Sequence, residues 1–83
     1  MRIAWEESAW NDYLWWQKQD RRILKRINEL IRDTIRDPYA GIGKPERLKY
    51  REGAWSRRIT DEHRLVYYPE GDLLIISQVR HHY

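Results

Sequence analysis

Glu46, Arg64 and His82 form a set of side chains that could cleave RNA without a metal ion. Cleavage by the RNA's own 2′-hydroxyl needs a base for that hydroxyl, a cation for the charge that builds on phosphorus, and an acid for the leaving 5′-oxygen. Glu46 could be the base, and Arg64 could clamp the phosphate with its forked guanidinium. His82 could be the acid, because imidazole titrates near neutral pH.

Two further residues fit the same chemistry. Lys49 follows Glu46 by three positions and belongs to a basic patch over residues 44–58. Tyr83 could stack on a base of the RNA or donate a hydrogen bond through its hydroxyl. Each assignment has a structural alternative. Glu46 could simply balance neighbouring lysines, Arg64 could be a strand arginine, and His82 with Tyr83 could be a frayed terminus.

Other chemistries fit the sequence poorly. The chain has no Cys, which excludes a thiol nucleophile, a disulfide and a Cys-based zinc site. Its three His residues lack the spacing of a metal site, and Ser8, Ser56 and Ser77 lie in no nucleophile elbow. We therefore expect neither a metal nor another cofactor.

The stretch from Trp55 to Tyr68 is interpreted as two strands joined by a tight turn at residues 60–62. It carries four basic side chains among apolar residues. They are Arg57, Arg58, His63 and Arg64. Because a sheet face takes up an arginine only where the charge is paired or hydrated, we interpret this hairpin as the floor of a wet, cationic site.

Basic residues concentrate between positions 44 and 58. Six cations and two acids give this segment a net charge of +4, whereas the whole chain carries +3. The cations are Lys44, Arg47, Lys49, Arg51, Arg57 and Arg58. A local basic patch with aromatic neighbours suits a polyanion such as RNA or DNA, and the alternative is a solvated face without a ligand.

The N-terminal half is predicted to contain one short strand and two helices. Residues 2–5 alternate as a strand does, and Glu6, Glu7 and Ser8 suit the start of a helix. Asp20 is a good N-cap for a longer amphipathic helix, which Asp37 and Pro38 end.

The C-terminal half is predicted to supply the rest of a sheet. Residues 39–45 form a loop, residues 46–50 a short strand, and residues 73–79 an apolar strand that we place at the centre, covered on both faces. The order of elements predicts an α+β fold for a single domain, 1–83. The two N-terminal helices should pack on one face of a mostly antiparallel twisted sheet and leave the other face free.

No stretch of the chain suggests a membrane protein or an exported one. No apolar run approaches the roughly 20 residues of a membrane span, and the N-terminus lacks the apolar core of a signal peptide. We expect a protein of the cytoplasm.

The sequence also resembles a known family over nearly its whole length. The matching stretches, in order, are W-x-x-x-x-W-x-D-Y-L-x-W at 5–16, I-N-E-L-I-x-D-T at 27–34, G-K-P-E-x-L-K at 43–49, W-S-R-R-I-T-x-E-H-R-L-V-Y at 55–67 and R-x-H-Y at 80–83. They resemble the YoeB/Txe toxins of the RelE/ParE superfamily of bacterial toxin–antitoxin proteins.

This resemblance implies a microbial-ribonuclease-like (RelE/ParE) fold and a ribosome-dependent endoribonuclease that cuts mRNA in the ribosomal A site. It implies that Glu46 is the general base, Arg64 the phosphate-stabilising arginine, His82 the general acid and Tyr83 a substrate contact, with Lys49 at a basic position that matters. The implied partners are ribosomal RNA, mRNA, a Phd/YefM-type antitoxin and a second copy of the chain. Operator DNA would be bound only through the antitoxin complex.

The resemblance leaves some assignments open. His81 stands where the family often has an aromatic residue, so either His81 or His82 could be the acid. Arg57 and Arg58 are interpreted as RNA-holding or antitoxin-contacting charges, and His63, although among the substrate-binding candidates, as structural. The alternatives to an RNA-cleaving toxin are a ParE-type gyrase poison and a non-catalytic nucleic-acid-binding module.

Overall fold

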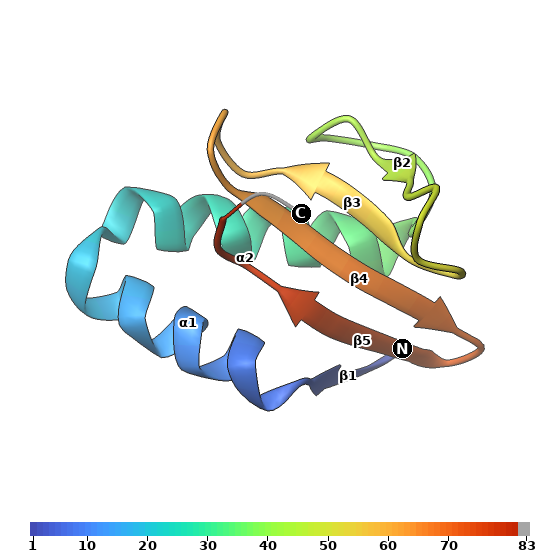
Figure 1. Ribbon diagram of the computed structural model, residues 1–83, viewed down its shortest axis with the longest axis horizontal. Helices are drawn as coiled ribbons and strands as arrows, with labels where there is room; N and C mark the ends of the chain where they lie inside the picture. Colours follow the sequence, from blue (N-terminus) through green and yellow to red (C-terminus); the bar gives the residue numbers. More distant parts are fainter. Residues whose placement is uncertain (82–83) are drawn as a thin grey trace.

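The computed structural model, which describes residues 1–81, contains two helices and five strands (Figure 1). In chain order they are β1 (Arg2–Trp5), α1 (Glu7–Gln19), α2 (Arg21–Arg36), β2 (Glu46–Arg47), β3 (Trp55–Arg58), β4 (Arg64–Glu70) and β5 (Leu73–Gln78). The predicted order of elements is confirmed, although β2 ends earlier than the expected strand over 46–50.

The strands form one mixed sheet in the order β1-β5-β4-β3-β2. Only the pair of β1 and β5 is parallel, and the other three pairs are antiparallel. The predicted α+β class with a mostly antiparallel sheet is therefore confirmed. The prediction that the last strand is central and doubly covered is wrong, because β4 is the middle strand and β5 buries Leu74 and Ile76 while Leu73 and Ile75 remain half-buried.

The two helices meet at Asp20, which acts as the predicted N-cap. Its carboxylate accepts hydrogen bonds from the backbone N–H groups of Arg22 and Ile23 and so satisfies two of the free donors at the start of α2. The last residue of α2 is Arg36, directly before Asp37 and Pro38, as predicted. No helix within residues 1–81 is long and apolar enough to cross a membrane.

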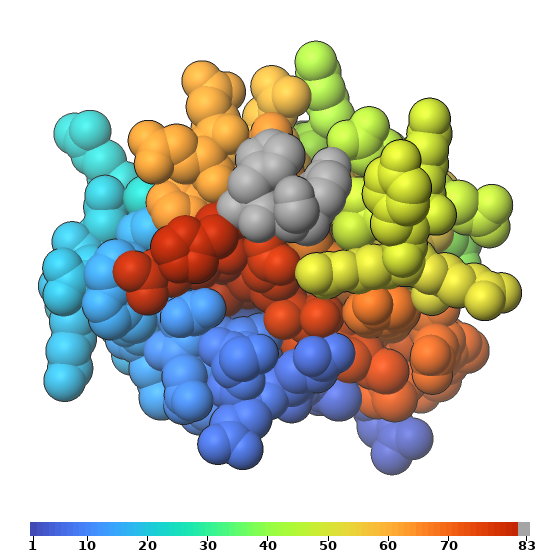
Figure 2. All heavy atoms as spheres, viewed as in Figure 1, coloured from blue at the N-terminus to red at the C-terminus, as the bar shows by residue number. Residues whose placement is uncertain are grey.

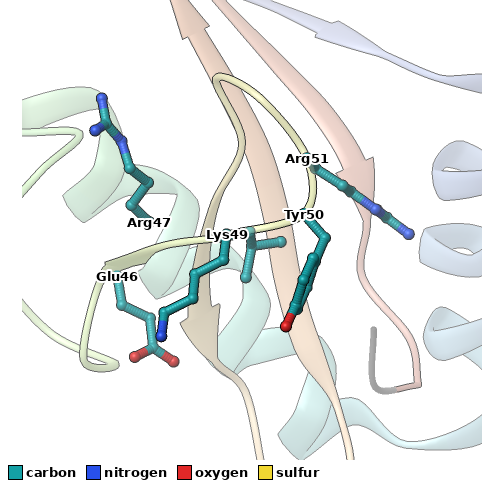
Figure 3. Close-up of a pocket in the computed structure, with 6 residues that line it drawn as sticks. Glu46, Arg47, Lys49, Tyr50 and Arg51 are labelled. Carbon is teal, nitrogen blue, oxygen red and sulfur yellow. The ribbon is translucent and has the colours of Figure 1, made fainter.

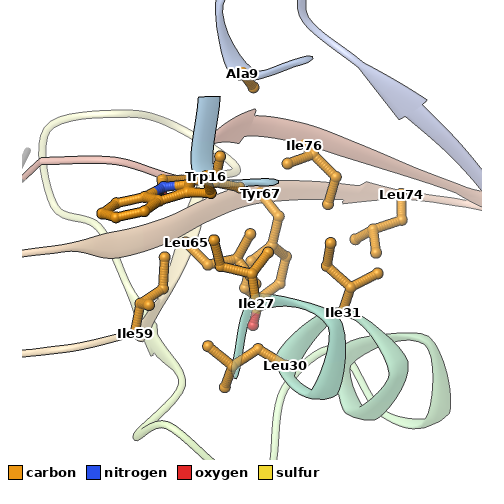
Figure 4. Packing of buried hydrophobic residues seen from close by; sticks show 11 residues of the cluster. Ala9, Trp16, Ile27, Leu30, Ile31, Ile59, Leu65, Tyr67, Leu74 and Ile76 are labelled. Atoms are coloured by element: carbon orange, nitrogen blue, oxygen red, sulfur yellow. The ribbon is translucent and has the colours of Figure 1, made fainter. Parts of the chain in front are cut away.

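The main core lies between the helices and the sheet (Figure 4). α2 contributes Ile27, Leu30 and Ile31, which meet Leu65 and Tyr67 of β4. Trp16 of α1 is buried in the same cluster, whereas its neighbour Trp15 is only partly buried, as expected for adjacent residues of a helix.

The sequence predicted that the opposite face of the sheet would be free. This prediction is wrong, because part of that face is covered. A second small cluster there unites Leu48, Ala54 and Val66, and Tyr68 packs against it. The segment between β2 and β3 folds over this part of the sheet, and Val66 has no exposed surface. This part of the second face is therefore covered, whereas Ile75 of β5 is only half-buried.

Candidate active site

The register of the strands brings Glu46 and Arg64 to the same face of the sheet. Glu46 of β2 is paired with Ser56 of β3, and Arg64 of β4 is paired with Arg58 of β3. Ser56 and Arg58 lie two positions apart on one strand and so share a face, as directly opposed partners do. Since Arg57, between them, points towards α2, the face with Glu46, Arg58 and Arg64 is the one away from the helices.

A cavity of about 430 Å³ lies at the edge of this face. It is lined by Glu46, Arg47, Leu48, Lys49, Tyr50 and Arg51. Figure 3 shows the side chains of Glu46, Lys49 and Tyr50 extending to the same side of the segment, whereas Arg47 points away. Two residues of the predicted site, Glu46 and Lys49, therefore open onto a single hollow.

Arg64 is held in place by the loop that precedes it. Only 8% of the residue is exposed, and its Nη1 donates to the carbonyl oxygens of Thr60, Asp61 and His63 at 2.6, 3.1 and 3.2 Å. A guanidinium carries five N–H donors in a rigid plane, so these bonds fix the direction of the whole group. The hairpin turn thus orients the arginine that we predicted to clamp a phosphate.

Arg57 has a different environment from the one that the sequence predicted. Its side chain is 0% exposed, and Nη1 lies 2.6 Å from the Asp33 carboxylate. Nη1 and Nη2 also donate to the carbonyls of Ile42, Asp37 and Ala40, and Nε to the hydroxyl of Tyr67. The interpretation of Arg57 as a charge that holds RNA or an antitoxin is therefore wrong, because every part of its guanidinium is used inside the protein.

The carboxylate of Asp33 is stabilised in its charged form. The backbone N–H of Ile42 and the side chains of Arg36 and Arg57 all donate to it, and they lower its pKa from 3.8 to about 2. The hydroxyl of Tyr67 donates to the carbonyl of Pro38 at 2.6 Å, and burial raises its pKa. Arg57, Asp33 and Tyr67 thus hold the loop over 37–43 against α2 and the sheet.

This loop precedes β2 and so determines where that strand begins, at Glu46. The carbonyl of Gly43 accepts a hydrogen bond from the backbone N–H of Arg58 at 2.6 Å. Gly43 has a positive φ of 80°, and a Cβ there would lie 2.7 Å from Cδ2 of Leu30. Only glycine combines this backbone conformation with such a close approach.

His63 contacts the C-terminal segment of the chain. Its Nδ1 accepts the backbone N–H of His81 at 2.8 Å, and its ring packs edge-on against Trp16 with centroids 4.9 Å apart. Burial lowers the pKa of His63, as do nearby His81 and Arg80, while Glu62 raises it. These contacts favour the structural interpretation of His63 over a role in binding substrate.

Residues 79–81 are attached to the rest of the protein at several points that the sequence did not reveal. Trp16 Nε1 donates to the carbonyl of Val79 at 2.9 Å, and the guanidinium of Arg80 lies 3.6 Å from the ring centre of Trp15 and 3.5 Å from Asp12. Figure 2 shows this red segment between blue α1 and the orange hairpin turn. No sequence signal marks these contacts, since they join residues more than 60 positions apart.

Three predicted site residues remain: Arg58, which the structure describes, and His82 and Tyr83. Arg58 is exposed at the end of β3, 3.9 Å from the Asp61 carboxylate, which is 97% exposed. His82 and Tyr83 lie outside the described residues. Within residues 1–81, no three side chains of the types that bind metals are grouped so that they could hold an ion.

Comparison with known proteins identifies close relatives of this chain. A family described as "YoeB-like toxin of bacterial type II toxin-antitoxin system" matches residues 5–83. Toxin YoeB of Escherichia coli K12 is 57% identical over 84 residues, with both chains fully covered. These matches cover the site segments described above.

Solved structures agree with the fold. The YoeB/ParE toxin from Agrobacterium tumefaciens superposes with a TM-score of 0.95 at 50% identity, with 100% of both chains covered. YoeB of Staphylococcus aureus, at 40% identity with 100% of this chain and 98% of that chain covered, superposes with TM-scores of 0.91 in a heterotetrameric YoeB–YefM toxin–antitoxin complex and 0.93 in a dimer.

Proposed function

Because the chain belongs to the YoeB-like toxin family of bacterial type II toxin–antitoxin systems, we propose that it is a ribosome-dependent endoribonuclease that cleaves mRNA in the ribosomal A site. The observation that carries this proposal is the register that brings Glu46 and Arg64 to one sheet face, where Glu46 and Lys49 line a cavity of about 430 Å³. A base and a lysine at one cavity, with an arginine on the same sheet face as the base, suit the handling of a phosphodiester.

In the proposed reaction, Glu46 takes the proton of the 2′-hydroxyl, and the resulting oxygen attacks the adjacent phosphorus. Arg64 stabilises the charge that develops on the phosphoryl oxygens, and the carbonyls that hold its Nη1 keep it oriented beforehand. Lys49 neutralises the same phosphate. His82 protonates the leaving 5′-oxygen, and Tyr83 contacts the RNA.

The proposed partners follow from the relatives. We propose that the chain binds an antitoxin of the YefM type, forms a homodimer, acts in the cytoplasm on ribosome-bound mRNA, and contacts operator DNA only as part of the antitoxin complex. The exposed cations around the cavity favour an antitoxin segment rich in acidic and aromatic residues, which folds on binding.

The test is primer extension on an mRNA under translation, with Glu46→Gln as the variant and Glu70→Gln as the matched control. Glu70 is an exposed glutamate at the far end of β4. Removal of a general base should lower the cleavage rate by about 10²- to 10⁴-fold, and the control should cut as the native chain does.

Two results would contradict the proposal. One is cleavage by Glu46→Gln at the native rate. The other is intact mRNA together with accumulation of cleaved DNA–gyrase complexes, which would identify a gyrase poison instead.

A further inference from the structure

His81 has a backbone conformation that needs support from its surroundings. Its φ is 67°, in the left-handed region, which a residue other than glycine adopts only at an energetic cost. Such a conformation persists where neighbouring groups fix it. His81 stands immediately before His82 in the sequence.

Three hydrogen bonds hold the backbone of His81. Its N–H donates to Nδ1 of His63 at 2.8 Å. Its carbonyl accepts from the backbone N–H of Arg64 and from Nε2 of Gln78, each at 3.0 Å. Of the three partners, the His63 imidazole alone can change its hydrogen-bonding character near neutral pH.

We propose that His63 is a positioning residue, whose neutral imidazole accepts the His81 amide and thereby fixes the backbone of His81, the residue next to the proposed acid. Its catalytic consequence rests on the proposed function, since His82 is the proposed acid. The anchoring itself does not rest on it. His63 also precedes Arg64, so one short segment holds both the proposed clamp and the backbone of His81.

The bond with His81 requires a specific form of the ring. Nδ1 can accept only when it carries no proton, so His63 must be the neutral tautomer with its hydrogen on Nε2. Packing against the uncharged indole of Trp16 favours a neutral ring, because burial lowers the pKa of His63. The charged or titratable groups that face it are Glu62, Arg80 and His81.

Acidification should therefore loosen the C-terminal segment. A proton on Nδ1 would turn this atom into a donor and set two N–H groups against each other. Folding favours the neutral ring, so its contribution is complete above pH 6.5, the ordinary pKa of His63, and declines as the pH falls below that value.

The test compares His63→Asn with His63→Leu. The Asn carboxamide oxygen lies as many bonds from the backbone as Nδ1, accepts a hydrogen bond and does not titrate, whereas Leu fills similar space without an acceptor. The first measurement is the protection factor of the His81 amide in hydrogen exchange by NMR, at pH 7.5 and pH 5. The second is single-turnover cleavage of ribosome-bound mRNA.

We expect the His81 amide to be protected at pH 7.5 in the native chain and in His63→Asn, and at least about tenfold less protected in His63→Leu. As the pH is lowered, the native chain should lose protection while the Asn variant keeps it. His63→Leu should lower the cleavage rate constant by roughly 10- to 100-fold, with ribosome affinity unchanged, and Asn should restore most of it.

Equal protection in His63→Leu would overturn the proposal, and so would native cleavage by a Leu variant that has lost protection. If the native chain itself cuts no mRNA, the proposed function fails. In that case the exchange data alone decide whether His63 anchors the segment.

Discussion

Arg57 and Arg58 are neighbours in the sequence with opposite environments. Successive side chains of a strand point to opposite faces, so only one of them can face the open side of the sheet. Alternation alone does not say which one. The partner that decides it is Asp33, 24 positions earlier on α2, whose carboxylate lies 2.6 Å from Nη1 of Arg57.

Replacement of these two arginines should therefore have separate effects. Arg57→Met removes one partner of a buried ion pair and leaves three loop carbonyls without a donor, so the free energy of unfolding should fall by about 3 kcal/mol. Arg58→Met removes an exposed side chain and should change it by less than about 0.5 kcal/mol. Urea unfolding measures both.

The same pair distinguishes stability from function. If Arg58 contacts RNA, Arg58→Met should weaken binding to ribosomes although the protein remains stable. An Arg57→Met variant that is as stable as the native chain would show that the buried network around Asp33 contributes little.

At the scale of elements, β2 is short, and the loop before it determines its position. β2 has two residues, and its pairing with β3 and the preceding Gly43 carbonyl help to tie it to the sheet. The position of Glu46 therefore depends on the packing of residues 37–43 as much as on the strand itself.

Gly43→Ala tests this dependence, with Gly71→Ala as the control. Both glycines have a positive φ, of 80° and 58°, so both substitutions introduce backbone strain. An added Cβ meets Leu30 only at Gly43, since nothing lies within 4 Å of the one at Gly71. We expect Gly43→Ala to be the more destabilising and to slow mRNA cleavage, while Gly71→Ala unfolds slightly more easily and cuts normally.

Equal losses of stability in the two variants would mean that strain alone matters. Native cleavage by a destabilised Gly43→Ala protein would mean that the loop does not position Glu46.

The sequence predicted the elements where local chemistry decides them. Asp20 caps α2 because its side chain reaches N–H groups two and three residues ahead, and Asp37–Pro38 ends the helix through local sterics. The place of β5 depends instead on which strands pair with it. Its apolar run suggested burial on both faces, but β5 lies between β1 and β4, one position from the edge.

The sequence predicted some features of the site and could not predict others. The spacing of Glu46 and Lys49 predicted that they lie close together, and both line one cavity. The register, which local sequence does not reveal, places Glu46 and Arg64 on one sheet face. The anchoring of residues 79–81 depends on contacts with Trp15, Trp16 and His63, and these appear only when α1, the hairpin and the C-terminal segment come together.

At the scale of the molecule, exposed positive charge lies on two sides. One group lies in and beside the segment that lines the cavity, and the other lies on the exposed surface of α2. With Arg57 buried, the first group is Lys44, Arg47, Lys49, Arg51 and Arg58. The second group lies on the exposed surface of α2, on the far side of the core from the first.

Salt dependence of ribosome binding should separate these two groups. In a Glu46→Gln background that binds without cutting, Arg51→Gln should reduce the slope of log affinity against log salt by about 1 if it removes one phosphate contact. Lys25→Gln, which changes an exposed residue of α2, should leave the slope unchanged. Equal reductions would show that binding does not use the cavity side in particular.

The most direct test of the whole account is cleavage of a ribosome-bound mRNA that carries a single 2′-deoxyribose at the scissile position of the A-site codon. We predict cleavage of the all-ribose mRNA within that codon and none of the deoxy-substituted one, because the attacking hydroxyl is missing. Equal cleavage of both would contradict attack by the 2′-hydroxyl, and no cleavage of the all-ribose mRNA would contradict the ribonuclease function itself.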